Sequence, residues 1–376
     1  MPRFAEMLRS SFEANGNTVK LWYPVARFQR LFRNRSLAKW AGYIDQFVIF
    51  PMHARRAIKD VPPDTLFVFA DQALGPWVPL VKNRPHVIHA HDLLALRSAL
   101  SDIPENPTSA TGRIYQRYIR RGFKRAKHFI SVSIKTQVDL HKFGQIKPIT
   151  SKVVYNGLNF PYSRLPASTA RAILRAADFP PMEHGFIMHI GGDQWYKNQL
   201  GVIEIYAKYV ALVRDPLPLC CISPTAAGQV QRALSTLPIG GRVHFVQNVS
   251  NVTLQAAYST ARALLFPSLA EGFGWPLVEA QACGCPVITT AEAPMTEVGG
   301  EAAIYLPRLK IGDDLEKWAS HGARQLQTVL AEDEESHVLR INKGMQWATK
   351  FSATTAISEY LSIYSAIVDL YRPTRP

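Results

Sequence analysis

Short apolar runs alternate with helical stretches through most of the chain. The first half contains four such runs, at residues 65–70 (TLFVFA), 86–90 (HVIHA), 129–132 (FISV) and 152–155 (KVVY). Continuous runs of this length are typical of strands buried on both faces of a parallel sheet. Helical patterns at 111–127 and 134–142 lie between them.

The same alternation restarts after residues 158–165 (LNFPYSRL), an irregular segment that we interpret as a linker. Strand patterns then lie at 185–190, 217–222, 243–246, 263–266 and 286–289, with helical patterns at 198–212 and 229–236. Repeated strand–helix alternation predicts parallel sheets with helices on both faces. Two such series predict two Rossmann-like, doubly wound α/β domains, which a length of 376 residues accommodates.

The start of the chain departs from this pattern. Residues 3–13 predict an amphipathic helix, and residues 17–23 (NTVKLWY) predict a strand after it. A doubly wound domain normally opens with a strand and a glycine-rich turn before its first helix. We therefore expect either that the first domain lacks its opening strand or that the protein begins upstream of Met1.

The net charge of +14 is concentrated in the first half of the chain. Residues 1–180 contain 28 lysines and arginines against 11 acidic residues, whereas the remainder contains 15 against 18. In the densest basic stretch, residues 113–127, Arg113, Arg117, Arg120 and Lys124 share one helical face. Such an asymmetry predicts an anionic partner, namely lipid headgroups, a lipid diphosphate or nucleic acid; the alternative is a solvated helix face.

Several classes of protein are disfavoured by what the sequence lacks. No apolar run reaches the roughly 18 residues that span a bilayer, and Met1 does not lead into the apolar core of a signal peptide. Four cysteines do not form a disulfide framework in a chain of this length, so we expect reduced thiols in a cytoplasmic protein. The motifs G-x-x-x-x-G-K-[ST], G-x-G-x-x-G after a strand, G-x-S-x-G and Asp-x-Asp are absent.

The most specific pattern occupies residues 264–290 (LLFPSLAEGFGWPLVEAQACGCPVITT). A strand is followed by a glycine-bearing loop, and Pro276 stands where the first residue of a helix is expected. Glycines allow a ligand to approach the backbone closely, and the amino terminus of a helix favours phosphate. Glu271 in the loop is suited to sugar hydroxyls, and Glu279 in the first helical turns is suited to a ribose diol. Without this surrounding pattern, the two glutamates would more simply be a solvated pair.

A second candidate segment is residues 189–198 (HIGGDQWYKN). A strand ends in Gly191 and Gly192 at the same edge of the same predicted sheet, and Lys197 follows at the start of a helix. A lysine beside a glycine-rich turn is suited to a diphosphate as a fixed positive charge. The alternative is a surface lysine near a turn.

The third candidate is residues 89–92 (HAHD), at the carboxyl end of the strand at 86–90. Such strand ends face the ligand crevice of a doubly wound domain, where His91 could bind a sugar hydroxyl or accept a proton. A His-x-His metal pair is a rival interpretation, but further ligands do not stand at comparable strand ends. A structural histidine, satisfied within the fold, is another.

Together these segments resemble family 4 of the glycosyltransferases, a retaining group with the GT-B fold. The resemblance rests on Glu271 to Glu279, which read as the E-x7-E motif with its EGFG-x-P-x-x-E core, and on the GG–KN segment. HDL at 91–93, SVSIKTQVDL and VVYNGLN at 153–159 resemble landmarks of the amino-terminal domain. The resemblance implies an acceptor-binding domain over 1–160, joined by a carboxy-terminal helix within 354–376, and a nucleotide-sugar domain over 161–353. It also implies that the two domains face each other across a cleft.

The resemblance further implies two groups of site residues. The donor side comprises Gly191, Gly192, Lys197, Asn198, Glu271, Gly272, Phe273, Gly274 and Glu279. The acceptor side comprises His91 and Asp92. Glu271, His91 and Lys197 would act on the reacting groups, and no metal or other cofactor is expected because the nucleotide-sugar is itself a substrate. The chain departs from the family pattern at Tyr196, where many members carry an arginine before the lysine.

We therefore expect a retaining hexosyltransferase that uses a GDP- or UDP-linked sugar and a saccharide or lipid-diphosphate-linked acceptor, in surface polysaccharide or glycoconjugate synthesis. We expect a cytoplasmic protein, peripheral on the inner face of the plasma membrane if its basic half binds anionic lipid, and no nucleic-acid partner. Two alternatives are a sugar-nucleotide epimerase or phosphorylase on a similar scaffold, and a basic non-enzymatic protein that binds nucleic acid or anionic membrane.

Overall fold

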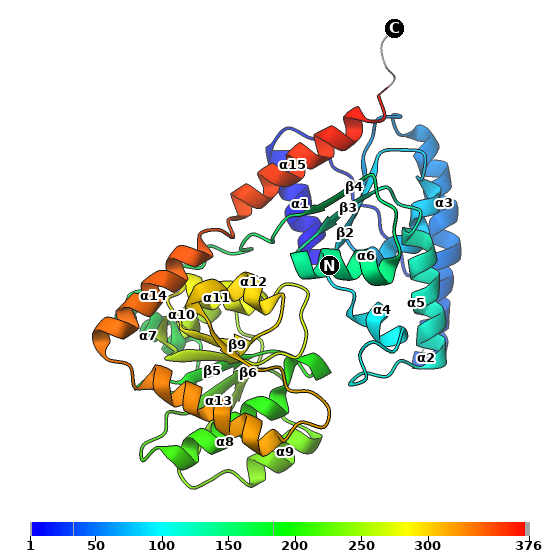
Figure 1. Cartoon of the computed structure of the whole chain (residues 1–376). Coiled ribbons are helices and arrows are strands. Elements are labelled where there is room, and N and C mark those ends of the chain that lie inside the picture. The colour runs from blue at the N-terminus through cyan, green and yellow to red at the C-terminus, as the bar shows by residue number, and fades with distance from the viewer. Residues whose placement is uncertain (1, 33, 183, 373–376) are drawn as a thin grey trace. The chain divides into compact units, whose positions relative to one another are not determined.

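The chain folds into two compact units, which a computed structural model describes for residues 2–32, 34–182 and 184–372 (Figure 1). Unit 1 comprises Met1–Asp102, Pro107–Tyr155 and Thr354–Pro376. Unit 2 comprises Asn156–Ala353 together with the short segment Ile103–Asn106. Each unit is built on one parallel sheet, with four strands in unit 1 and six in unit 2.

Unit 1 has the strand order β1-β2-β3-β4, which follows the chain. Its elements are α1 (Pro2–Ala14), η1 (Gln29–Leu31), α2 (Arg35–Ile44), the π-helix η2 (Asp45–Ile49), α3 (Phe50–Ala57), η3 (Ile58–Asp60), β1 (Phe67–Phe69), η4 (Gln72–Leu80), β2 (His86–Ala90), α4 (Leu94–Ala99), α5 (Ala110–Phe123), β3 (His128–Ser131), α6 (Ile134–Gly144), β4 (Thr150–Val153) and α15 (Ala353–Asp369). The four apolar runs predicted in this half are therefore its four strands, within two residues at each end.

Both faces of the unit 1 sheet are covered, because neighbouring strand residues point to opposite sides. Ile88 and Phe129 face a core formed with η4, α5 and α6. Val87 and Ile130, one residue away, face a second core that contains the apolar residues of α1 and α15. The terminal helices α1 and α15 thus share one face of the sheet (Figure 1).

The prediction of a strand at residues 17–23 is wrong. These residues run without regular secondary structure, and no sheet pairing includes them among the described strands. Trp22 still packs its ring against Phe67 of β1, with the centroids 5.8 Å apart. The apolar residues of this segment therefore resembled a strand in the sequence, although the segment makes no ladder with β1.

Unit 2 has the strand order β10-β9-β8-β5-β6-β7. Its elements are α7 (Ala167–Ala176), β5 (Ile187–Ile190), η5 (Trp195–Lys197), α8 (Gln199–Leu212), β6 (Leu219–Ile222), α9 (Gly228–Ser235), β7 (Val243–Val246), α10 (Asn251–Thr260), β8 (Ala263–Phe266), α11 (Trp275–Ala282), β9 (Val287–Thr290), α12 (Met295–Gly299), η6 (Gly300–Ala302), β10 (Ile304–Leu306), α13 (Leu315–Leu330) and α14 (Glu334–Ala348). The sequence pattern predicted every one of these strands except β10.

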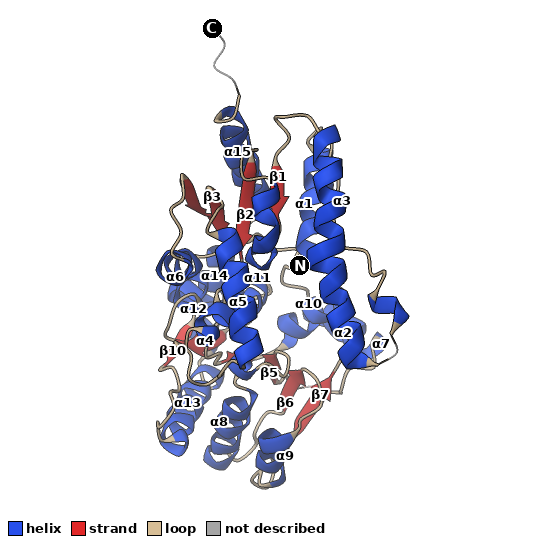
Figure 2. Ribbon diagram, turned by 90° about the vertical axis from the view of Figure 1, so that its right-hand side faces the viewer, coloured by secondary structure: helices blue, strands red, loops and turns tan. Residues whose placement is uncertain are grey.

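The order of the unit 2 strands reverses between β5 and β8, which are neighbours in the sheet. Strands β6 and β7 extend to one side of β5 (Figure 2), and β9 and β10 extend to the other side of β8. Helices α8 and α13 cover one face, over a core that includes Ile187, Leu219 and Leu265. Reversal points of this kind leave a crevice at the carboxyl ends of the two central strands, where ligands bind in open α/β sheets.

Candidate functional site

The loops that leave β5 and β8 meet at the reversal point of the unit 2 sheet. Both carry the residues that the sequence singled out, since Gly191 to Asn198 follow β5 and Glu271 to Gly274 follow β8. Two hydrogen bonds to backbone carbonyl groups join the loops. The Leu269 amide donates to the Tyr196 carbonyl at 2.7 Å, and the Asn198 side-chain amide donates to the Pro267 carbonyl at 3.0 Å.

An ion pair lies between these two loops. Lys197 Nζ donates to Glu271 Oε1 at 2.8 Å, and the side chains are only 15% and 10% exposed. The ammonium group also lies 4.9 Å from the ring centroid of Phe266. Because water screens a pair this buried far less than a surface pair, each charge fixes the position of the other. The two residues that the sequence placed on separate motifs are thus brought together.

Glycine at position 191 leaves room for the lysine. A Cβ atom at Gly191 would lie 3.1 Å from Cγ of Lys197, which is tighter than ordinary packing. The lysine stem therefore passes directly over the backbone of Gly191 on its way to Glu271. Gly192, the next residue, has the Gln194 side chain beside it, 2.4 Å from where its Cβ would stand.

Asn198 holds the turn rather than presenting its side chain outward. Its backbone is left-handed, with φ of 52°, and its Oδ1 accepts the Gly201 amide hydrogen at 3.3 Å at the start of α8. Its Nδ2 donates to Pro267, as described above. Because both the Oδ1 and the Nδ2 atom of this buried side chain are hydrogen-bonded within unit 2, Asn198 fixes the backbone of the turn and thereby orients the preceding residue, Lys197.

The loop after β8 leads into the amino terminus of α11. Gly274 is the N-cap residue with φ of +95°, a left-handed conformation that favours glycine, and Pro276 lies in the first turn. The side chain of Phe273 is buried against Trp275 and Phe351. The helix dipole therefore places partial positive charge at the loop that carries Glu271.

Glu279 lies inside unit 2, one turn into α11, and is 7% exposed. Tyr258 of α10 donates its hydroxyl hydrogen to Oε2 at 3.0 Å. Burial raises the pKa of Glu279 to about 7, against the opposing effects of the Tyr258 hydrogen bond and the charge of Lys197. The carboxyl group is thus held in one orientation and titrates near neutrality.

Arg308 stabilises the loop after β8 through a hydrogen bond and ion pairs. Its Nε donates to the Leu269 carbonyl at 2.8 Å, and its guanidinium group meets Glu105 Oε1 at 2.7 Å. Glu292 lies 3.7 Å away. The charge of Arg308 is therefore balanced by carboxylates, so it supports the loop rather than supplying a second free cation beside Lys197.

His91 and Asp92 lie in unit 1, directly after β2. The imidazole Nε2 of His91 donates to the Ala70 carbonyl at 2.9 Å, which leaves Nδ1 as the acceptor. Burial lowers the pKa of His91, so the ring is neutral at pH 7. Burial likewise raises the pKa of Asp92, whose Oδ1 accepts the Leu94 amide hydrogen. Neighbouring His89 is a core residue, with Nε2 2.5 Å from the Tyr364 hydroxyl.

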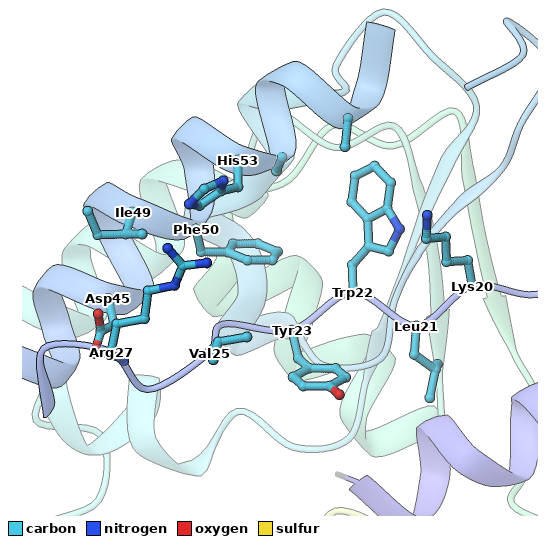
Figure 3. Close-up of a pocket in the computed structure, with 12 residues that line it drawn as sticks. Lys20, Leu21, Trp22, Tyr23, Val25, Arg27, Asp45, Ile49, Phe50 and His53 are labelled. Carbon is cyan, nitrogen blue, oxygen red and sulfur yellow. Dashed lines mark hydrogen bonds between the residues drawn. The ribbon is translucent and has the colours of Figure 1, made fainter. Parts of the chain in front are cut away.

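Two further features of the structure carried no signal in the sequence. Tyr258 lies 21 positions before Glu279, and no local motif links them. A groove of about 350 Å³ lies in unit 1 between residues 20–27 and α3 (Figure 3). Within the described ranges, no group of three or more His, Cys, Asp or Glu side chains is placed to hold a metal ion. No helix in the part of the chain that the structure covers is both long and apolar enough to cross a bilayer.

Two family models match the chain. Residues 3–160 match the model described as Glycosyltransferase Family 4, and residues 171–303 match the model described as Glycosyl transferases group 1. The first match lies almost entirely in unit 1 and the second lies in unit 2.

Two curated relatives act on O-antigen chains by their names. The O-antigen chain mannosyltransferase RfbU of Salmonella typhimurium is 26% identical over 248 residues, which are 65% of this chain and 61% of the relative. The O-antigen chain mannosyltransferase B of Escherichia coli is 21% identical over 305 residues, which are 78% of this chain and 76% of the relative. The chain therefore spans less than two thirds of the length of the first.

Among solved structures, WaaG, a glycosyltransferase involved in lipopolysaccharide biosynthesis, has a TM-score of 0.67 at 15% identity. The match covers 96% of this chain and 95% of that one. At this identity the likeness concerns the fold, and it confirms the predicted class of two Rossmann-like α/β units of the GT-B type. Because the family models extend over both units and the fold agrees with them, the chain belongs to glycosyltransferase family 4, the glycosyl transferases of group 1.

Proposed function

We propose that this glycosyltransferase moves a hexose, with mannose as the first candidate, from a nucleotide diphosphate sugar to a saccharide or lipid-linked acceptor, with retention at the anomeric carbon. The observation that carries the proposal is the buried Lys197–Glu271 pair at the reversal point of unit 2, with buried Glu279 on the helix that follows. Mannose is suggested by the two O-antigen relatives, which are mannosyltransferases by name.

In this proposal the donor binds to unit 2 alone. The diphosphate lies at the amino end of α11 and beside Lys197, where the helix dipole and the ammonium charge stabilise it. Glu279 accepts hydrogen bonds from the ribose hydroxyls through the oxygen that Tyr258 does not occupy. The diphosphate competes with Glu271 for Lys197, and Glu271 is then free to accept hydrogen bonds from the hexose.

The reaction needs stabilisation of a leaving group more than a strong base. The bond between C1 of the hexose and the diphosphate oxygen breaks, and both electrons stay with the diphosphate. Lys197 and the α11 dipole stabilise that developing negative charge. The acceptor hydroxyl forms the new bond to C1 from the same side, and its proton passes to the departing phosphate oxygen. On the acceptor side, neutral His91 offers Nδ1 as a hydrogen-bond acceptor for a sugar hydroxyl.

A panel of GDP- and UDP-linked sugars tests the proposal with purified protein. Release of nucleotide would be measured for each sugar, with and without EDTA. We expect one donor to be turned over, in an EDTA-resistant manner. Glu271→Gln should reduce that turnover about 100-fold, because an interaction made in the transition state is lost.

Glu316→Gln is the matched control, since Glu316 also pairs with a lysine, Lys208, but is 77% exposed. It should leave turnover unchanged. If no sugar nucleotide in the panel is turned over, and no nucleotide raises the melting temperature of the protein, the proposed donor site would be contradicted. Equal losses in the two variants would show that Glu271 has no specific role.

A further inference from the structure

The longest helical segment of unit 1 carries large apolar side chains on its outer face. Helices α2, η2 and α3 run without interruption from residue 35 to residue 57 (Figure 2). Five side chains at spacings of three and four are about half exposed: Leu37 (52%), Trp40 (63%), Ile44 (45%), Val48 (50%) and Met52 (49%). The solvent face of a helix normally carries polar residues. We call these five residues the apolar stripe.

Other faces of the same segment make its contacts with the rest of unit 1. Phe50 packs against Trp77, with ring centroids 4.3 Å apart. Tyr43 and Phe47 contact Tyr115 of α5, with centroids 5.8 and 6.0 Å apart. The core contacts are thus made without the apolar stripe.

A second set of exposed apolar side chains lies on the η1 turn, which is hydrogen-bonded to the same helical segment. The buried carboxylate of Asp45 accepts backbone hydrogens from Arg27, Phe28 and Gln29, each at 3.0 Å. These bonds hold the η1 turn against the helix. Three apolar side chains of this turn are exposed to solvent: Phe28 (40% exposed), Leu31 (71%) and Phe32 (44%).

The charge around the stripe is almost entirely positive. Residues 14–59 contain nine lysines and arginines and one acidic residue, which is the buried Asp45. Arg30, Lys39, Arg55 and Arg56 are exposed. No exposed carboxylate of this segment offsets them, so the surface is both apolar and cationic.

The groove beside α3 has the same character. Figure 3 shows Trp22 and Phe50 turned into it, with the cationic groups of Lys20 and Arg27 at its borders. Tyr23, 69% exposed, points away from the helix. Apolar surface, aromatic rings and cations therefore continue from the stripe into the extended segment next to it.

We propose that the apolar stripe and the η1 turn form a docking surface for an anionic lipid bilayer, with the helix lying in the plane of the interface. An interfacial helix combines an apolar face with flanking cations, so that both the acyl region and the lipid headgroups are matched. A nucleic acid would match the cations but leave the stripe in water. The surface goes beyond the proposed transfer reaction and would bring the enzyme to a lipid-linked acceptor.

Sedimentation with vesicles tests this surface without any sugar donor, so its failure leaves the donor site untouched. The probe is phosphatidylcholine vesicles with about 30 mol % phosphatidylglycerol, compared with pure phosphatidylcholine. We expect binding to the anionic vesicles alone. The double variant Trp40→Ser, Ile44→Ser should weaken binding about tenfold or more, because both side chains leave water on docking. Arg55→Gln, Arg56→Gln should weaken it and reduce its salt dependence.

Ile149→Ser is the matched control, since Ile149 is 65% exposed in unit 1 but distant in sequence from the stripe. It should bind like the unaltered protein, and circular dichroism would confirm that all variants are folded. Trp40→Phe should keep the binding but reduce the quenching of tryptophan fluorescence by brominated lipid. Unchanged binding of the Trp40→Ser, Ile44→Ser variant would overturn the proposal. So would a change of oligomeric state in that variant without a change in vesicle binding.

Discussion

The buried carboxyl group of Glu279 leads to a prediction with a definite size. Burial raises its pKa from an ordinary 4.5 to about 7, although the Tyr258 hydrogen bond and Lys197 oppose the rise. A tenfold change in an acid constant corresponds to about 1.4 kcal/mol, so the whole rise is equivalent to about 3 kcal/mol.

The sign of the effect follows from where the proton is bound. The raised pKa means that folded Glu279 holds its proton more tightly than it does in the unfolded chain. Between pH 4.5 and about 7 the folded state therefore binds more protons, and the free energy of unfolding falls as the pH rises. Below this window the carboxyl group is neutral in both states, whereas above it the fold contains a buried carboxylate.

Glu279→Gln isolates this effect, because glutamine has a similar shape, can accept the Tyr258 hydrogen bond and does not ionise. Urea unfolding would be followed by tryptophan fluorescence across this range. The variant should be more stable than the unaltered protein by about 1 kcal/mol near pH 5 and by about 3 kcal/mol near pH 8. Glu316→Gln, at an exposed position, should show no such trend. A stability difference that stays constant with pH, or that reverses, would refute the reasoning.

Three further changes test other parts of the structure. Lys197→Gln leaves the 10%-exposed Glu271 side chain without its cation, so urea unfolding should show a loss of about 3 kcal/mol, and nucleotide release should fall about 100-fold. Tyr258→Phe removes a hydrogen bond that lowers the pKa of Glu279, so the pKa should rise in the variant. The KM for the donor should therefore reach its constant high-pH value at a higher pH, and kcat above that pH should be unchanged. Gly122→Ala places a Cβ 2.2 Å from the Gly75 carbonyl oxygen, where α5 meets η4, and should lower the melting temperature by several degrees, whereas Gly344→Ala, with its nearest neighbour at 3.5 Å, should not.

Most of the strands were predictable because each is a short, mainly apolar run between turns or helical patterns. The runs at 86–90, 243–246 and 263–266 coincide with β2, β7 and β8 residue for residue. Strand β10 has three residues, like the edge strand β1 that the run at 65–70 predicted, but it directly follows the short helix η6 and only Leu306 is buried. For a segment of three residues, hydrophobicity alone does not decide whether the chain forms a strand.

The segment from η1 to α3 could not be derived from the same reasoning. Its apolar residues recur at helical spacing, but the exposed ones, such as Trp40, lie on the face turned away from the core. A periodic pattern cannot indicate which face is buried when two faces are apolar. The strand expected at 17–23 failed for a related reason, since Trp22 is packed on β1 without backbone pairing.

The candidate donor site was predictable only in its local pieces. Each motif could be placed at the carboxyl end of a strand, and parallel strands bring such ends to one edge of the sheet. The sequence could not show that Lys197 and Glu271 form a pair or that Asn198 is occupied inside the fold, because these contacts join positions about 70 residues apart. The roles of these residues toward a sugar donor remain predictions.

Hydrogen–deuterium exchange with and without the donor identified in the sugar-nucleotide panel tests the location of the donor site most directly. We predict slower exchange of backbone amides in two segments of unit 2, residues 187–201 and 264–283, because they contain the loops of the Lys197–Glu271 pair and the start of α11. Glu316→Gln should show the same protection, and Lys197→Gln should lose it. Protection confined to unit 1 segments such as 86–97, with both unit 2 loops unchanged, would contradict the assignment of the donor to unit 2.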